Sequence, residues 1–165
     1  MGWSQPHSWV AGELVTAALL NTHLRDNLEF LKAPPTALYH VNQASDYTTT
    51  STSFVDVDAT NLALTINTAG GDVLIVFMGY GGGTGRLYFD VAVDNVRMAG
   101  DDGFLSAVNG SNSPITLVAL KQGLPPGNHT FKLQWKVNSG SGVLYAGAGT
   151  SGLDFHPQFF VREVS

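Results

Sequence analysis

The side chains with the clearest potential for chemistry are histidines and carboxylates, and their spacing does not form a known metal motif. The chain contains five histidines, which are His7, His23, His40, His129 and His156. No His-Glu-x-x-His or His-x-His pattern is present. Asp154 and His156 are two residues apart and would share one face of a strand, but a capping or surface role is favoured over a metal site. The sequence therefore predicts no metal site and no cofactor.

Catalytic patterns are also missing from the sequence. There is no Gly-x-Ser-x-Gly elbow. Asp101 and Asp102 are adjacent in a turn-like Asp-Asp-Gly, so their carboxylates would not converge on a strand. The glycine-rich run 79–85 could suggest a phosphate loop, but a strand-like segment follows it where a helix would be needed. We therefore predict a hairpin loop at this run and a chain that is not an enzyme.

Aromatic side chains offer a different chemistry, because sugar rings stack on aromatic faces. Trp135 alternates with Phe131 and Leu133 along one segment, which favours a place in a core. Tyr80 lies beside three glycines, and Tyr47 lies in the polar run 45–53. Tyr47 and Tyr80 are accordingly the candidate contacts for a ligand or receptor, for which a host surface glycan is one candidate.

One helix is predicted near the N-terminus, after an irregular arm that contains Trp3 and Trp9. Thr16 supplies an N-cap hydroxyl for the segment AALLNTHLRDNLEFLK, and Pro34 with Pro35 ends the helix. Four leucines recur at spacings of four, four and three and form one apolar stripe. We predict that assembly or docking uses this stripe and the two arm tryptophans: Trp3, Trp9, Leu20, Leu24, Leu28 and Leu31.

Everything after this segment is predicted to be strands. Nine short segments are rich in β-branched and aromatic residues, and Gly, Pro, Asn and Asp separate them. The expected strands are 37–43, 53–57, 62–67, 73–78, 87–93, 115–120, 130–137, 143–146 and 158–164. The run 73–78 is continuously apolar, which predicts cover on both faces, in the domain centre or at a subunit contact.

This alternation predicts a mainly β fold, an antiparallel β-sandwich or jelly roll with a short arm and one α-helix. We expect two parts: residues 1–35, the arm with a docking or oligomerisation helix, and residues 36–165, the head domain. The stripe has two alternative partners, which are the protein's own sandwich and the helices of sister copies or another protein.

The composition restricts the classes of partner. Only 13 % of the 165 residues are charged, against about 25 % in typical soluble domains, so part of the surface is expected to be buried against partner subunits. The net charge of -5 argues against nucleic acid, and no segment is long enough for membrane insertion. There is no cysteine, and the first residues do not resemble a secretory signal.

The segment WVAGELVTAALLNTHLRDNL at residues 9–28 resembles one that opens many small virion structural proteins of tailed bacteriophages and prophages. In that family a Trp–Val arm and a Val-Thr-Ala-x-x-Leu-Asn-x-x-Leu-Arg-Asp-Asn helix precede a β-rich domain. The likeness is specific over about the first 32 residues, and beyond them it is architectural only, to jelly-roll heads of phage fibres and tumour-necrosis-factor-like trimers.

The resemblance implies a virion protein that is assembled in the cytoplasm of a bacterial host. It implies a homotrimer that contacts other tail or capsid proteins, with no catalytic residues. A tail-associated fibre or adhesin head for host attachment is the first expectation. A capsid decoration protein that clamps capsomers is the second, and a carbohydrate-binding module is the alternative from another class.

Overall fold

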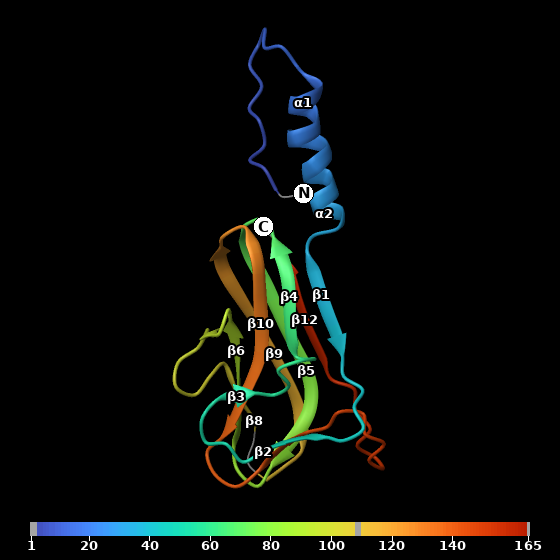
Figure 1. The fold of residues 1–165 in the computed structure, drawn as a ribbon, viewed down its shortest axis with the longest axis vertical. Coiled ribbons are helices and arrows are strands. Elements are labelled where there is room, and N and C mark those ends of the chain that lie inside the picture. The colour runs from blue at the N-terminus through green and yellow to red at the C-terminus, as the bar shows by residue number, and fades with distance from the viewer. Residues whose placement is uncertain (1–2, 108–109, 165) are drawn as a thin grey trace.

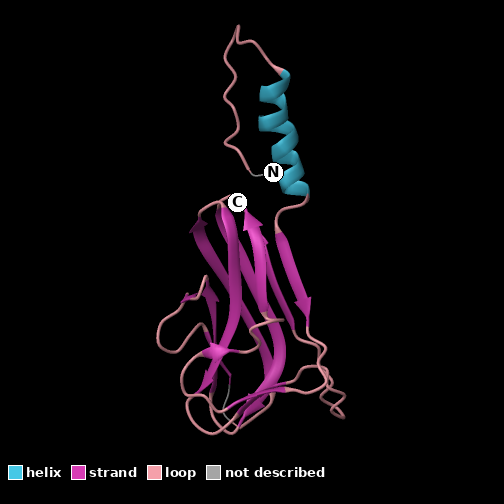
Figure 2. Ribbon diagram, viewed as in Figure 1, coloured by secondary structure: helices cyan, strands magenta, loops and turns pink. Residues whose placement is uncertain are grey.

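The structure is a computed structural model that describes residues 3–107 and 110–164. Two antiparallel sheets face each other, and a helix with its preceding arm extends from one end of them (Figures 1 and 2). This architecture confirms the predicted antiparallel sandwich with an arm and one helical segment. The helical segment consists of α1 (Ala17–Leu20), the π-helical turn η1 (Asn21–Arg25) and α2 (Asp26–Lys32).

Among the described residues, each of the two sheets has six strands. The first sheet contains β1 (Thr36–His40), β2 (Tyr47–Thr49), β5 (Gly71–Gly83), β9 (Ser113–Leu124), β11 (Gly142–Leu144) and β12 (Gln158–Glu163). The second contains β3 (Val55–Asp56), β4 (Ala63–Thr68), β6 (Leu87–Val93), β7 (Val96–Arg97), β8 (Leu105–Ala107) and β10 (Gly127–Val137).

The order of the principal strands is that of a jelly roll. In the first sheet the neighbours run β1-β12-β5-β9, and in the second they run β4-β10-β6-β8, with antiparallel pairing at every step. Eight antiparallel strands divided between two sheets in this interleaved order form the double Greek key of a jelly roll. The first and last strands, β1 and β12, lie side by side and continue toward the end that carries the helix (Figure 1).

The core between the sheets forms because the strands alternate inward and outward residues. On β10, Phe131, Leu133 and Trp135 are buried, as the sequence predicted. Aromatic rings connect the two sheets, because the centroids of Phe77 on β5 and Phe89 on β6 are 5.7 Å apart. Within the second sheet, the Phe89 ring also lies 6.1 Å from that of Trp135. These rings fix the spacing between the sheets near the middle of the sandwich.

The glycine run contradicts the predicted hairpin loop. Strand β5 continues through Gly79–Gly83, and Gly81 and Gly83 pair with Leu144 and Gly142 of β11. A Cβ atom on Gly81 would lie 2.3 Å from the Val143 carbonyl oxygen, and one on Gly83 would lie 2.1 Å from the Ser141 oxygen. These glycines therefore permit the close approach of another backbone, which is one of the established uses of glycine within a strand.

The helix begins where the sequence predicted. The Thr16 hydroxyl oxygen accepts a hydrogen bond from the Leu19 N–H at 3.2 Å, which is an N-cap. The π-helical turn was not predicted, and it affects the leucine stripe. An α-helix advances about 100° per residue, so two steps of four residues would rotate Leu28 about 80° away from Leu20. The wider π turn lowers the advance per residue and keeps these leucines nearer to one line.

Candidate assembly interface

The leucine stripe of the helix is exposed in the single chain. Leu20, Leu24, Leu28 and Leu31 are 40 to 65 % exposed. The helix extends away from the sandwich, so the stripe does not fold back onto the chain's own sheets (Figure 1). In the single chain the stripe therefore does not pack on its own sandwich. The other alternative is a partner from sister copies or another protein.

The N-terminal arm covers a different face of the same helix. The Trp3 ring lies 6.2 Å from the ring of Phe30, which is buried. The Ser4 N–H donates to Asn27 Oδ1 at 2.9 Å, and Asn27 Nδ2 returns a bond to the Ser4 carbonyl oxygen at 2.9 Å. The His23 ring bonds to the Gln5 carbonyl oxygen at 2.9 Å. The arm is thus fixed on the chain's own helix, and the stripe is left open.

Both predicted arm tryptophans are half exposed, but their contacts differ. Trp3 packs on the helix, whereas the Trp9 ring packs edge-on against His7 near the far end of the arm, with centroids 4.6 Å apart. His7 also pairs with Glu13. Trp3 anchors the arm to the helix, and a docking role for Trp3 and Trp9 toward another protein stays a prediction.

A second apolar surface covers the outside of the first sheet. The register aligns Leu38, Phe160, Val76 and Val118 in one row across β1, β12, β5 and β9. The two neighbouring rows are mixed: Leu74 and Leu120 pair on one side, in a row with Thr36 and Arg162, and Met78 lies on the other, in a row with His40, Gln158 and Thr116. We call this surface the outer face, and it consists of Leu38, Leu74, Val76, Met78, Val118, Leu120 and Phe160.

The outer face explains the continuously apolar run 73–78. Val73, Ile75 and Phe77 point into the core and are buried, so their neighbours point outward. On the outer face, Leu38, Met78, Val118 and Leu120 are 45 to 62 % exposed. Apolar residues on both sides of a strand are expected where both sides are covered. Within the described part of the chain nothing covers the outward side.

The stripe and the outer face meet at one place. A hollow of about 310 Å³ lies where α2 passes into β1, and Leu31 of the stripe and Leu74 of the outer face both line it. Phe30 and Pro34 form the helix side of the hollow, and Arg162 lies on the sheet side. The two apolar surfaces therefore meet at this hollow, where the exposed Arg162 side chain lies beside Leu74. Large continuous apolar patches on soluble proteins mark interaction sites.

Comparison with known proteins gives a likeness of fold. No protein family and no curated protein matches the sequence. The solved structures that resemble the chain include the Eiger TNF of S. frugiperda, with a TM-score of 0.43 and 11 % identity over 81 % of this chain and 95 % of that one.

The VP2 subviral particle of infectious bursal disease virus is also similar, with a TM-score of 0.36 and 13 % identity over 79 % of this chain. Dimeric latent PorU of Porphyromonas gingivalis has a TM-score of 0.34 and 10 % identity over 79 % of this chain. This chain spans 37 % of the VP2 chain and 13 % of PorU. Similarity at this level does not transfer a function, and the assignment of the jelly roll rests on the strand order.

Tyr80, the first candidate ligand contact, lies on β5 beyond Met78. Its ring stacks on Phe155 with centroids 4.3 Å apart, and its hydroxyl donates to the Asn112 carbonyl oxygen at 3.3 Å. A shallow hollow of about 330 Å³ includes Tyr80, Phe155 and His156. The ring is half-buried, so it offers a partial stacking surface at the edge of the outer face. Its contact with a receptor stays a prediction.

Tyr47, the second candidate, lies on β2 and packs against the core. Its hydroxyl donates to Asp58 Oδ2 at 2.7 Å. Burial and the neighbouring Asp58 carboxylate raise the pKa of Tyr47 well above its usual value. Burial opposes ionisation of Asp58, but hydrogen bonds from Asn61 and Tyr47 outweigh it and lower the pKa of Asp58 to about 2. The polar group of Tyr47 is therefore engaged in holding the 47–61 segment together.

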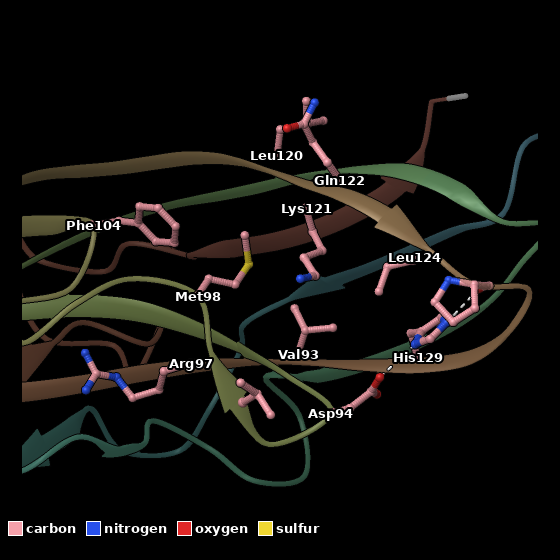
Figure 3. Close-up of a pocket in the computed structure, with 12 residues that line it drawn as sticks. Val93, Asp94, Arg97, Met98, Phe104, Leu120, Lys121, Gln122, Leu124 and His129 are labelled. Carbon is pink, nitrogen blue, oxygen red and sulfur yellow. Dashed lines mark hydrogen bonds and ion pairs between the residues drawn. The ribbon is translucent and has the colours of Figure 1, made fainter.

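A separate cleft of about 630 Å³ opens at the edge of the sandwich, between β9 and the β6–β7 hairpin (Figure 3). Its walls combine apolar and charged side chains, and the Lys121 side chain extends into it toward Val93. His129 and Asp94 lie at one end. The described residues that line the cleft include no Ser, Thr or Cys that could act as a nucleophile beside this pair.

His129 is held by two acceptors. Its Nδ1 lies 2.7 Å from Asp94 Oδ2, and its Nε2 lies 2.9 Å from the Pro125 carbonyl oxygen. Only the protonated ring can donate to both at once. The hydrogen bond from His129 to Asp94 accordingly raises the pKa of His129, and the same bond lowers the pKa of Asp94.

This pair predicts a pH-dependent stability. Because the pKa of His129 is raised in the folded state, its contribution is complete below about pH 6.5 and is lost as pH rises through the folded value. We expect His129→Gln to lower the free energy of unfolding by about 1 kcal/mol near pH 6 and by less near pH 9. Urea denaturation at both pH values measures this, with the exposed His40→Gln as baseline. An equal loss at both pH values would show that His129 does not stabilise through its charge.

Two searches of the described residues complete the description of possible sites. No three His, Asp or Glu side chains within 3–107 and 110–164 lie close enough together to hold a metal ion. No helix in the same ranges has the length and apolar character to cross a bilayer.

Proposed function

We propose that this protein is a non-catalytic structural component of a bacteriophage virion, in which three copies associate through the outer face. The observation that carries the proposal is the uncovered row Leu38, Phe160, Val76 and Val118 on an otherwise complete sandwich. Burying such surface is favourable by about 25 cal/mol for each Å² removed from water. Identical chains usually associate with closed rotational symmetry. Three copies are proposed because the sequence pattern of the β-domain resembles that of trimeric jelly-roll heads.

The shape and the N-terminal sequence support a proposed place within the virion. The helix and arm extend from one end of the head (Figure 1). Residues 9–28 resemble the opening segment of phage structural proteins. We assign the arm and helix to attachment and the head to the projecting end of a tail-associated fibre or adhesin. Tyr80 at the edge of the outer face is the proposed receptor contact, with a host surface glycan as the ligand class.

Mass measurement and particle labelling test this function. Sedimentation equilibrium of the full-length chain should give three times the 17.5 kDa chain mass at micromolar concentration. Antibody labelling of purified phage particles should place the protein on the tail. A stable monomer would contradict the trimer, and labelling over the capsid surface would replace the fibre assignment with a capsid decoration protein. A monomer that binds sugars would favour the carbohydrate-binding module.

A further inference from the structure

The helix carries an apolar stripe that its own chain leaves uncovered. The arm covers the side that contains Asn27 and Phe30, which are the buried residues of this helix. The stripe leucines lie on a different side and remain exposed. A helix of this length is marginally stable alone in water, so cover over the stripe is needed to hold it.

The stripe is also aligned with the outer face. Leu31 and Leu74 line one hollow, so a molecule that covers the outer face at Leu74 also reaches the stripe at Leu31. Only Ala33, Pro34 and Pro35 separate the helix from β1, which belongs to the sheet that bears the outer face. Copies that pack their outer faces around an axis parallel to the strands would place their helices at the same end of the assembly. The helices would then run in the same direction.

We propose that the leucine stripe is covered by the same stripe of the sister copies, in a parallel helix bundle that continues the axis of the head. This rests on the proposed association of heads through the outer face. The occupant is another copy of this chain, because the continuity at Leu31 and Leu74 makes one partner cover both surfaces. The π turn supports this packing, since it brings Leu20 and Leu28 nearer to one line. The arm then lies on the outside of the bundle.

Single cysteines test the bundle directly, since the chain has none of its own. Leu28→Cys should form a disulfide between two copies under mild oxidation, because equivalent positions of a parallel bundle face each other. In a trimer one cysteine of each three stays unpaired, so about two thirds of the chains should run as covalent dimers on a denaturing gel. Glu29→Cys is the matched control, because Glu29 is exposed and its direction on the helix is about 100° away.

The outcome distinguishes a failure of the proposed helix bundle from a failure of the proposed trimer. A trimer by sedimentation with strong cross-linking at position 28 and little at position 29 supports the bundle. A trimer in which both positions cross-link weakly and equally overturns the bundle and leaves the association of the heads standing. A monomer overturns both. Circular dichroism of each variant confirms that the cysteine has not unfolded the chain, and cross-linking that does not change on tenfold dilution of the trimer excludes random collision.

Discussion

Val118→Asp is expected to separate the trimer into folded monomers. Val118 lies on β9 at the end of the apolar row, and it is the most exposed residue of the outer face at 62 %. In the monomer an aspartate there would remain in water and disturb little. In the trimer each copy would bury an unpaired carboxylate at a cost of roughly 3–5 kcal/mol. The dissociation constant should rise by more than about a hundredfold.

Sedimentation velocity across a dilution series measures the change, and far-UV circular dichroism checks the fold. Val55→Asp is the matched control, because Val55 is also an exposed valine on a strand but lies on β3 of the second sheet. That variant should remain trimeric. A Val118→Asp protein that keeps the trimer mass at micromolar concentration would show that copies associate through another surface.

Phe89→Ala is expected to give a large loss of stability in the head. Phe89 is fully buried, and its ring contacts Phe77 of the opposite sheet and Trp135 of its own sheet. Removing a buried phenylalanine typically costs about 3–5 kcal/mol, since apolar contacts are lost and a cavity remains. Aromatic pairs add about 0.5–1.5 kcal/mol beyond the buried area.

Urea denaturation followed by far-UV circular dichroism measures this loss. The variant is best made in the Val118→Asp chain, so that unfolding of a monomer does not include dissociation. Phe155→Ala serves as the control, because Phe155 is 40 % exposed and should cost less than about 1.5 kcal/mol. A loss at Phe89 no larger than that at Phe155 would show that the middle of the sandwich repacks freely.

The sequence predicted those helices and strands whose signals lie in neighbouring residues, such as a cap or a regular spacing of apolar side chains. Thr16 and the leucine spacing located the helix, and the alternation in β10 placed Phe131 and Trp135 in the core. The glycine run misled the prediction, because the composition of Gly81–Gly83 is that of a turn. The approach of β11 makes it a strand, and β11 is distant in sequence. The short strands β2, β7 and β8 were missed because two or three residues give no periodicity.

The candidate interface was predicted only in part, because some of its residues are brought together by strands that are distant in sequence. The stripe leucines follow from spacing within one helix, and the exposure of the stripe agrees with a role in docking. The row Leu38, Phe160, Val76 and Val118 draws one residue from each of four strands. Its members come together only through strand pairing, which a single sequence does not specify. The continuous apolar run 73–78 was the one local signal of this row. A strand that is apolar on both sides needs the core on one side and another covering surface on the other.

The pairing of the first strand with the last also determines when the head can form. β1 lies beside β12, and His156 bonds to the Val41 carbonyl oxygen 115 residues away along the chain. Closing so long a loop costs entropy before it gains contacts, which makes sandwiches slow to fold. During synthesis the helix leaves the ribosome before the strands of the head, whereas the first sheet must wait for β12. The leucine stripe is therefore present in the cell before any head exists, and completion of the head is the step that sets the timing of assembly.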